Sequence, residues 1–238
     1  MFEFLRPRTP IQKLTKRLTE TGGEDGPRIE AAQRLGEMDT PEATFTLAKR
    51  FTMSSKVITQ DIEEKRMVVD MLASKGERAV EPLVRFLKSY HQVEWPVQAL
   101  ARILPTDQLV QRLVEILESV AQNPFTSPEH RSSLIKAMRG HVTPEVLEVL
   151  RKSLEDDDDD VRIAAVNAVA EIGESAREIL LAAFGPAAER PRIRIAIAEV
   201  FADRDWPVKG FRPTIEAGLP EGFYLTAKGL IRRRGAPE

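Results

Sequence analysis

Residues 159–173 read Asp159-Asp-Val-Arg-Ile-Ala-Ala-Val-Asn-Ala-Val-Ala-Glu-Ile-Gly173, and this stretch decides the fold. Its apolar residues recur at intervals of three and four: Val161, Ala164, Ala165, Ala168, Val169 and Ile172. This spacing places them on one face of an amphipathic helix. Gly173 ends the pattern, and a left-handed helix C-cap is expected there.

The same pattern returns later in the chain as an internal repeat. Residues 193–202 match residues 161–170 at an offset of 32. Residues 173–180 also match residues 76–83, at an offset of 97, which is about three such units. A single helix of this kind cannot bury its apolar face alone, so the helices are expected to stack as antiparallel pairs.

These residues resemble a known family of helical repeats. Residues 159–173 are similar to the second helix of a HEAT repeat, including the Asp before the helix and Val161-Arg162 at its start. The amino-acid sequence of these repeats also resembles the HEAT-like repeats of phycobilisome lyases and of stand-alone bacterial HEAT proteins. The resemblance implies an all-α fold, a right-handed α-α superhelix (a HEAT/ARM-like solenoid) of about six helix pairs.

The periodicity predicts where the helices lie. The expected pairs are 10–21 with 27–38, 41–52 with 60–74, 77–89 with 95–104, 107–121 with 128–139, 144–154 with 160–172, and 175–184 with 190–203. After Trp206 the chain is rich in Gly and Pro, and residues 223–226 and 230–233 alternate around Lys228-Gly229, which is typical of a β-hairpin. We therefore expect a solenoid at 1–207 and a tail at 208–238, whose hairpin docks on the last helices or pairs with a partner.

Composition and charge limit the classes of function. The chain has 238 residues, of which 42% are hydrophobic, enough for a buried core. Its 35 Lys and Arg against 37 Asp and Glu give a net charge of −2, so no global field favours nucleic acid or anionic lipid. The absence of cysteine excludes disulfides and thiolate chemistry. Without a signal-peptide pattern or a long apolar run, the expected location is the cytoplasm.

Two sets of polar residues are candidates for a metal site. The acidic run 155–160 lacks the Gly-punctuated spacing of a Ca²⁺ loop, so it is predicted to be a solvated turn in which Asp159 or Asp160 caps the following helix. None of His91, His130 and His141 precedes a Glu, as paired His-Glu dipeptides would require in a deoxyhypusine-hydroxylase-like di-iron site. We expect exposed histidines, no metal and no cofactor.

Other uses of HEAT arrays stay open as alternatives. A bilin lyase-like protein or an alkyl-base DNA glycosylase-like enzyme would need an acid, base or metal constellation that the sequence does not present, so the chain is not expected to be an enzyme. Nucleic-acid binding could involve two terminal basic clusters. They comprise Arg6, Arg8, Lys13, Lys16 and Arg17 at one end and Arg232, Arg233 and Arg234 at the other.

The main functional expectation is a protein-binding surface. The resemblance implies that second helices line a concave face, and their polar positions are expected to form a ladder. These positions are Asp70, Gln98, Arg102, Ser132, Lys136, Arg139, Asn167, Glu171, Glu199 and Asp203. The ladder is basic in its middle and acidic toward the C-terminus, which suits a protein or peptide of mixed charge. The predicted partner-binding residues are Arg102, Arg131, Lys136, Arg139, Asn167 and Glu171.

Overall fold

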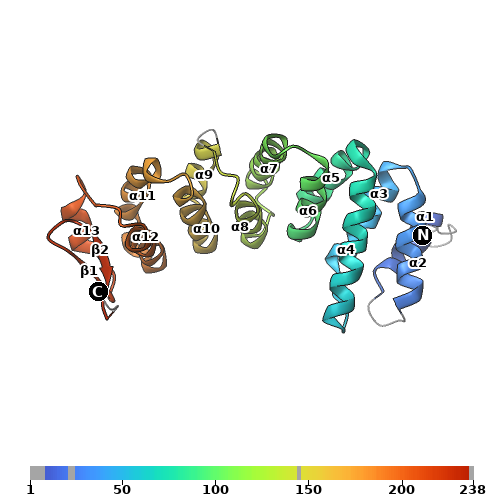
Figure 1. Ribbon diagram of the computed structural model, residues 1–238, viewed down its shortest axis with the longest axis horizontal. Helices are drawn as coiled ribbons and strands as arrows, with labels where there is room; N and C mark the ends of the chain where they lie inside the picture. Colours follow the sequence, from blue (N-terminus) through green and yellow to red (C-terminus); the bar gives the residue numbers. More distant parts are fainter. Residues whose placement is uncertain (1–8, 21–24, 144–145, 236–238) are drawn as a thin grey trace, which may run out of the picture. The chain divides into compact units, whose positions relative to one another are not determined.

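The structure, a computed structural model, describes residues 9–20, 25–143 and 146–235. The predicted basic positions Arg6 and Arg8 lie outside the described residues. The chain divides into two compact units, Met1–Asn123 and Pro124–Glu238. Each is built from short helices joined by tight turns (Figure 1).

The described part of the first unit has two layers of α-helices. They are α1 (Pro10–Leu18), α2 (Asp25–Glu37), α3 (Pro41–Ala48), α4 (Ile58–Ser74), α5 (Val80–Ser89), α6 (Glu94–Ile103) and α7 (Thr106–Ala121), with 3-10 turns η2 (Lys49–Thr52) and η3 (Gly76–Ala79). In one layer α1, α3, α5 and α7 pack each against the next, and in the other α2, α4 and α6 do the same. Leucines on the facing stripes, such as Leu35, Leu72 and Leu83, are fully buried and form the core.

The second unit repeats this construction and ends in a small sheet. Its elements are α8 (Pro128–Ala137), α9 (Leu147–Ser153), α10 (Asp159–Ala170), η5 (Glu174–Ala176), α11 (Arg177–Phe184), η6 (Pro186–Glu189), α12 (Pro191–Arg204), α13 (Arg212–Gly218), β1 (Phe223–Leu225) and β2 (Ile231–Arg233). Helices α8, α10 and α12 pack side by side, while α9 and α11 cover α10. The second helices of successive pairs therefore share one layer.

The predicted class, an all-α helical-repeat fold with a small hairpin, is confirmed, and each of the twelve predicted helices is present. Two local expectations are wrong. Gly173 has a positive φ of 87°, but its ψ of −153° lies outside the left-handed helical region, in a conformation that only glycine adopts easily. The tail also contains a helix, α13, that was not predicted. The division at residue 207 stays a prediction.

A buried ion cluster lies between α2, η2 and α4 of the first unit. Its members, all at most 8% exposed, are Arg28, Arg50, Asp61, Glu64 and Lys65. Glu64 Oε2 accepts hydrogen bonds from Arg28 Nε at 2.7 Å and from Arg50 Nε at 2.8 Å. Asp61 accepts from Arg50 Nη2 and from Lys65 Nζ, both at 2.6 Å. The cluster thus ties together segments far apart in the sequence.

The charges of this cluster are balanced by one further contact. Asp25, at the start of α2, pairs with Arg28 and brings three carboxylates against three cations. Burial by itself would raise the pKa of Glu64, but hydrogen bonds from Arg28 and Arg50 outweigh burial and hold that pKa below its ordinary value. The pKa of Asp61 is likewise lowered, because hydrogen bonds from Lys65 and Arg50 outweigh burial. Both carboxylates are therefore held in their charged form.

The C-terminal hairpin docks on α12, which is one of the two predicted arrangements. Its strands are antiparallel, with Tyr224 opposite Arg232, and Gly229 in the connecting turn has a φ of 76°. Ile231 is fully buried, and β2 packs against α12. Arg233 Nη1 also donates to Asp203 Oδ1 of that helix at 2.5 Å. The hairpin is thus part of the second unit's core.

Candidate functional site

The layer of α8, α10 and α12 presents one polar side chain from each helix at matching positions. These residues, Lys136, Asn167 and Glu199, are separated by 31 and 32 positions and are called the central row. Lys136 and Glu199 are exposed and Asn167 is half-buried. Asn167 Nδ2 donates to the Ile163 carbonyl of its own helix at 3.0 Å. Among the residues that the structure describes, no ion pair involves Lys136 or Glu199, although the charge of Glu199 contributes to the raised pKa of Arg233.

The neighbouring predicted residues are engaged within the chain. Arg131 holds Asp156 through two hydrogen bonds of 2.9 Å, from Nε and Nη2. Arg139 Nε donates to Glu171 Oε1 at 2.7 Å, and the other oxygen of Glu171 accepts from the Gly140 amide at 2.6 Å. Arg102 belongs to the first unit, where it pairs with Asp70. Whether these residues bind a partner stays a prediction.

The repeat length explains several of these pairs. Arg102–Asp70, Arg139–Glu171 and Arg192–Asp160 each join residues 32 apart. This spacing equals, to within one residue, the 31 or 32 positions between equivalent residues of successive repeats, so each pair links neighbouring second helices or the residues at their ends. Opposite charges about one repeat apart are the sequence signal for this pairing, and it was not among the predictions.

The acidic run is a capping turn, as predicted, but Asp158 is the N-cap of α10 and not Asp159 or Asp160. Its side chain accepts from the amides of Asp160 and Val161. The next two carboxylates bind arginines at the start of α12, Asp159 with Arg190 at 2.8 Å and Asp160 with Arg192 at 2.6 Å. Within the described ranges, no three His, Asp or Glu side chains are placed to hold a metal ion.

Two residues of helix α8 are more buried than the sequence predicts. His130, expected to be exposed, is 6% exposed, whereas His91 and His141 are exposed as predicted. Ser132, expected on the ladder, is 3% exposed, and its hydroxyl donates to the Glu129 carbonyl at 3.1 Å. His130 corresponds to the buried Val161 one repeat later, so a polar residue occupies a core position and obscures the helix phase.

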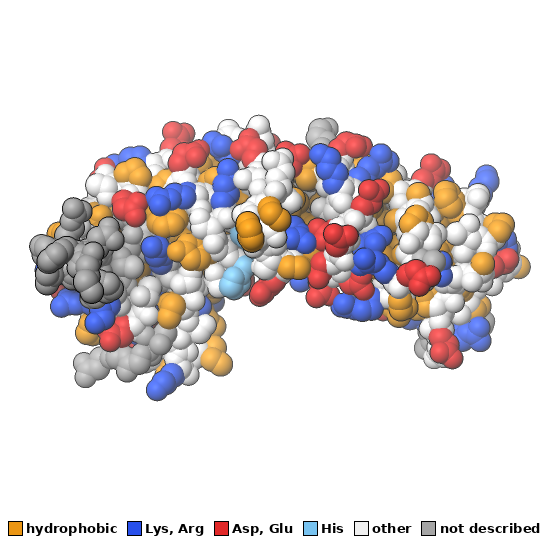
Figure 2. All heavy atoms as spheres, turned by 180° about the vertical axis from the view of Figure 1, so that it is seen from behind, with side chains coloured by type: hydrophobic (Ala, Val, Ile, Leu, Met, Phe, Trp, Pro, Cys, Tyr) orange, Lys and Arg blue, Asp and Glu red, His pale blue; other side chains and the backbone are white. Residues whose placement is uncertain are grey.

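The basic side chains of the two terminal clusters differ in their surroundings. Lys13, Lys16 and Arg17 are exposed on α1. At the other end, Arg232 pairs with Asp205 at 2.7 Å and Arg233 pairs with Asp203. Figure 2 shows that acidic and basic side chains alternate over the visible surface without a large patch of one sign. On this face, cations therefore lie among anions.

One further observation bears on the location of the protein. Across the described residues, no helix combines the length and the apolar character that a membrane span requires.

Comparisons with known proteins agree with this construction. Residues 110–202 match the family model of HEAT repeats. No curated protein sequence matches the chain. The solved structure of human deoxyhypusine hydroxylase in complex with glycerol is similar over 87% of this chain and 77% of that chain, with 18% identity and a TM-score of 0.31. These values are too low to transfer an activity. Residues 110–202 therefore carry HEAT repeats, and the described helices of both units are arranged in similar pairs.

Proposed function

We propose that this protein is a non-catalytic interaction scaffold that binds another protein on the face formed by α8, α10 and α12. This face would be the concave side of the predicted solenoid. The observation that carries the proposal is the central row, in which a cation, an amide and an anion follow one another on three adjacent helices. Helical-repeat proteins commonly bind partners through surfaces built in this way.

The spacing of the central row sets the distance between two charged side chains of the proposed partner. Adjacent helices pack about 8–10 Å apart, so the helix that carries Lys136 and the helix that carries Glu199 are separated by roughly 16–20 Å. A bound segment would place an acidic side chain against Lys136 and a basic side chain against Glu199. In an extended chain these two side chains would be about five or six residues apart.

The surroundings support binding by preformed shape. The ion pairs Arg131–Asp156 and Arg139–Glu171 link α8 to α10 or to the turn before it, which holds the central row in place without using its charges. Ile195, one turn before Glu199 on α12, is 38% exposed and offers an apolar contact. Charge complementarity of this kind sets orientation and association rate more than total affinity.

The test is photo-crosslinking from Asn167 in the cells that natively make this protein. A photoreactive residue replaces Asn167, and the crosslinked proteins are identified by mass spectrometry. We expect a partner that is crosslinked from position 167 and lost when Lys136→Glu and Glu199→Lys are combined, because both charge contacts are then reversed.

The matched control combines Lys209→Glu with Glu189→Lys. These residues are exposed in the same unit but lie outside the central row, and the exchange leaves the net charge unchanged. The control variant should be crosslinked like the unmodified protein. Equal crosslinking of the central-row variant, with its unfolding midpoint unchanged, would contradict the proposal.

A further inference from the structure

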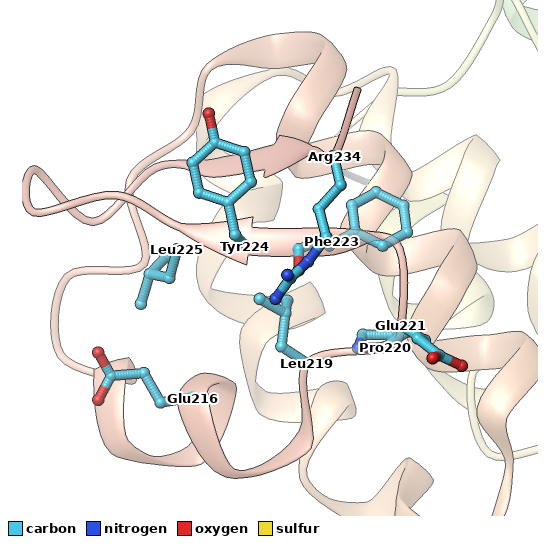
Figure 3. A pocket seen from close by; sticks show the side chains of 8 residues that line it. All are labelled: Glu216, Leu219, Pro220, Glu221, Phe223, Tyr224, Leu225 and Arg234. Atoms are coloured by element: carbon cyan, nitrogen blue, oxygen red, sulfur yellow. The ribbon is translucent and has the colours of Figure 1, made fainter. Parts of the chain in front are cut away.

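A second candidate site lies in the C-terminal part of the second unit, away from the central row. A pocket of about 680 Å³ opens between α13 and β1 (Figure 3). Its walls are partly apolar, with Leu219 after α13 and Leu225 at the end of β1. The side chains of Tyr224 and Arg234 are exposed at this pocket. The pocket thus combines apolar surface with one accessible cation, Arg234, and with the carboxylates of Glu216 and Glu221.

On the outer edge of β1, Phe223 is already bonded, since its amide donates to Pro220 O at 3.2 Å and its carbonyl accepts from Arg234 Nε, so Leu225 is the residue to consider. Tyr224 lies opposite Arg232, and the bonds Arg234 N to Gly222 O and Thr226 N to Leu230 O flank that pair at alternate positions. In an antiparallel pair, alternate residues direct their N–H and C=O groups away from the partner strand. Leu225 is one of these residues, and within the described ranges neither its amide nor its carbonyl has a hydrogen-bond partner outside the strand pair. One donor and one acceptor therefore face the pocket side of β1.

Arg234 supplies the charge at the same edge. Its Nε donates to the carbonyl of Phe223 at 3.1 Å, which fixes the side chain along the outer edge of β1. Figure 3 shows the guanidinium reaching from there toward Leu219. In the described part of the chain no carboxylate pairs with Arg234, whereas Arg232 and Arg233 each have one. An arginine held in this way binds a carboxylate strongly, since two parallel N–H groups can donate to it.

We propose that this pocket binds an extended peptide of another protein, which adds a strand to the free edge of β1 and places a carboxylate on Arg234. Strand addition satisfies the exposed backbone groups of Leu225, and apolar side chains of the peptide contact Leu219 and Leu225. The acidic group distinguishes this peptide from other extended chains. The site shares no residue with the central row, so it stands or falls independently of the function proposed above.

The test uses capped peptides of about nine residues with alternating Thr and Val, in which a single Glu is moved through the sequence. A second set carries Gln in place of Glu. Binding is measured by fluorescence anisotropy, and the exchange of the Leu225 amide is followed by NMR. We expect at least one Glu peptide to bind about tenfold more tightly than its Gln counterpart and to protect the Leu225 amide from exchange.

Two variants test whether Arg234 causes the preference for Glu. Arg234→Gln should remove the preference for Glu, while Lys228→Gln, which removes one cation from the hairpin turn outside the pocket, should preserve it. Three results would overturn the proposal. One is that no peptide binds at about 1 mM, and another is binding without protection of the Leu225 amide. The third is a Leu225 amide that is protected in the free chain and loses protection when residues 236–238 are deleted, since the chain's own end would then occupy the edge.

Discussion

Glu64 of α4 links two other segments of the first unit, because it accepts hydrogen bonds from both Arg28 of α2 and Arg50 of η2. Replacing it by Gln removes the negative charge that these buried guanidinium groups share. Removing one partner of a buried ion pair costs about 3–5 kcal/mol, since the remaining charge is left uncompensated. We expect Glu64→Gln to lower the free energy of unfolding of the first unit by about 3 kcal/mol.

The chain offers a specific probe for this measurement. Trp95 lies in α6 of the first unit and Trp206 in the second, so urea unfolding of a Trp206→Phe background reports the first unit through Trp95 fluorescence. Glu63→Gln is the matched control, because Glu63 is exposed beside Glu64 on the same helix. A loss no larger than that of the control would show that the cluster does not stabilise this unit.

At the scale of an element, α4 makes the first unit sensitive to acid. It carries both Asp61 and Glu64, and the pKa of each is lowered in the folded state. A carboxyl group of this kind contributes stability above its unfolded pKa of about 4 and loses it as the pH falls through its folded pKa. The free energy of unfolding reported by Trp95 should therefore fall as the pH is lowered from about 5 to about 3.

The Asp61→Asn variant tests the origin of this effect. It removes one of the two titrating groups, so its stability should start lower and fall less steeply over the same range. The comparison uses the pH dependence of the Trp95-reported midpoint in the Trp206→Phe background. An unchanged slope would show that Asp61 does not contribute to the acid sensitivity.

Elements also differ in how well the sequence predicts them. The helix α10 could be predicted because Val161, Ala164 and Ala165 keep the strict repeat spacing, and all three are buried. The short helix α13 could not, since only Ile215 of its seven residues is buried and no periodicity can develop over two turns. The buried ion cluster could not be predicted, because charged residues are usually found at the surface.

For the whole molecule, the pairing of charges predicts weak affinity for nucleic acid. The net charge is −2, and many arginines are engaged by carboxylates of the same chain, so few phosphate contacts and little counterion release are expected. We expect the protein to pass through immobilised duplex DNA at about 50 mM salt without retention. Retention that is reversed by added salt would revive the terminal basic clusters as a binding site.

The sequence analysis predicted the layer of second helices but not the availability of its charges. Lys136 and Arg139 look equivalent in the sequence, yet only Arg139 has an acidic residue one repeat away, Glu171. Whether a charged side chain has an ion-pair partner depends on two adjacent repeats, so the position of the residue within one repeat does not reveal it. A search for opposite charges at the repeat offset would have separated the two residues.

The ion pairs that join residues 32 apart also restrict how this chain can change in length. One residue inserted within α10 between Asp160 and Glu171 would turn the two carboxylates about 100° relative to each other. Asp160 and Glu171 could then no longer meet Arg192 and Arg139 together. A duplicated block of 32 residues would instead carry its own matching charges. Insertions and deletions should therefore be tolerated in whole repeats, or in the turns between helices, and rejected inside the second helices.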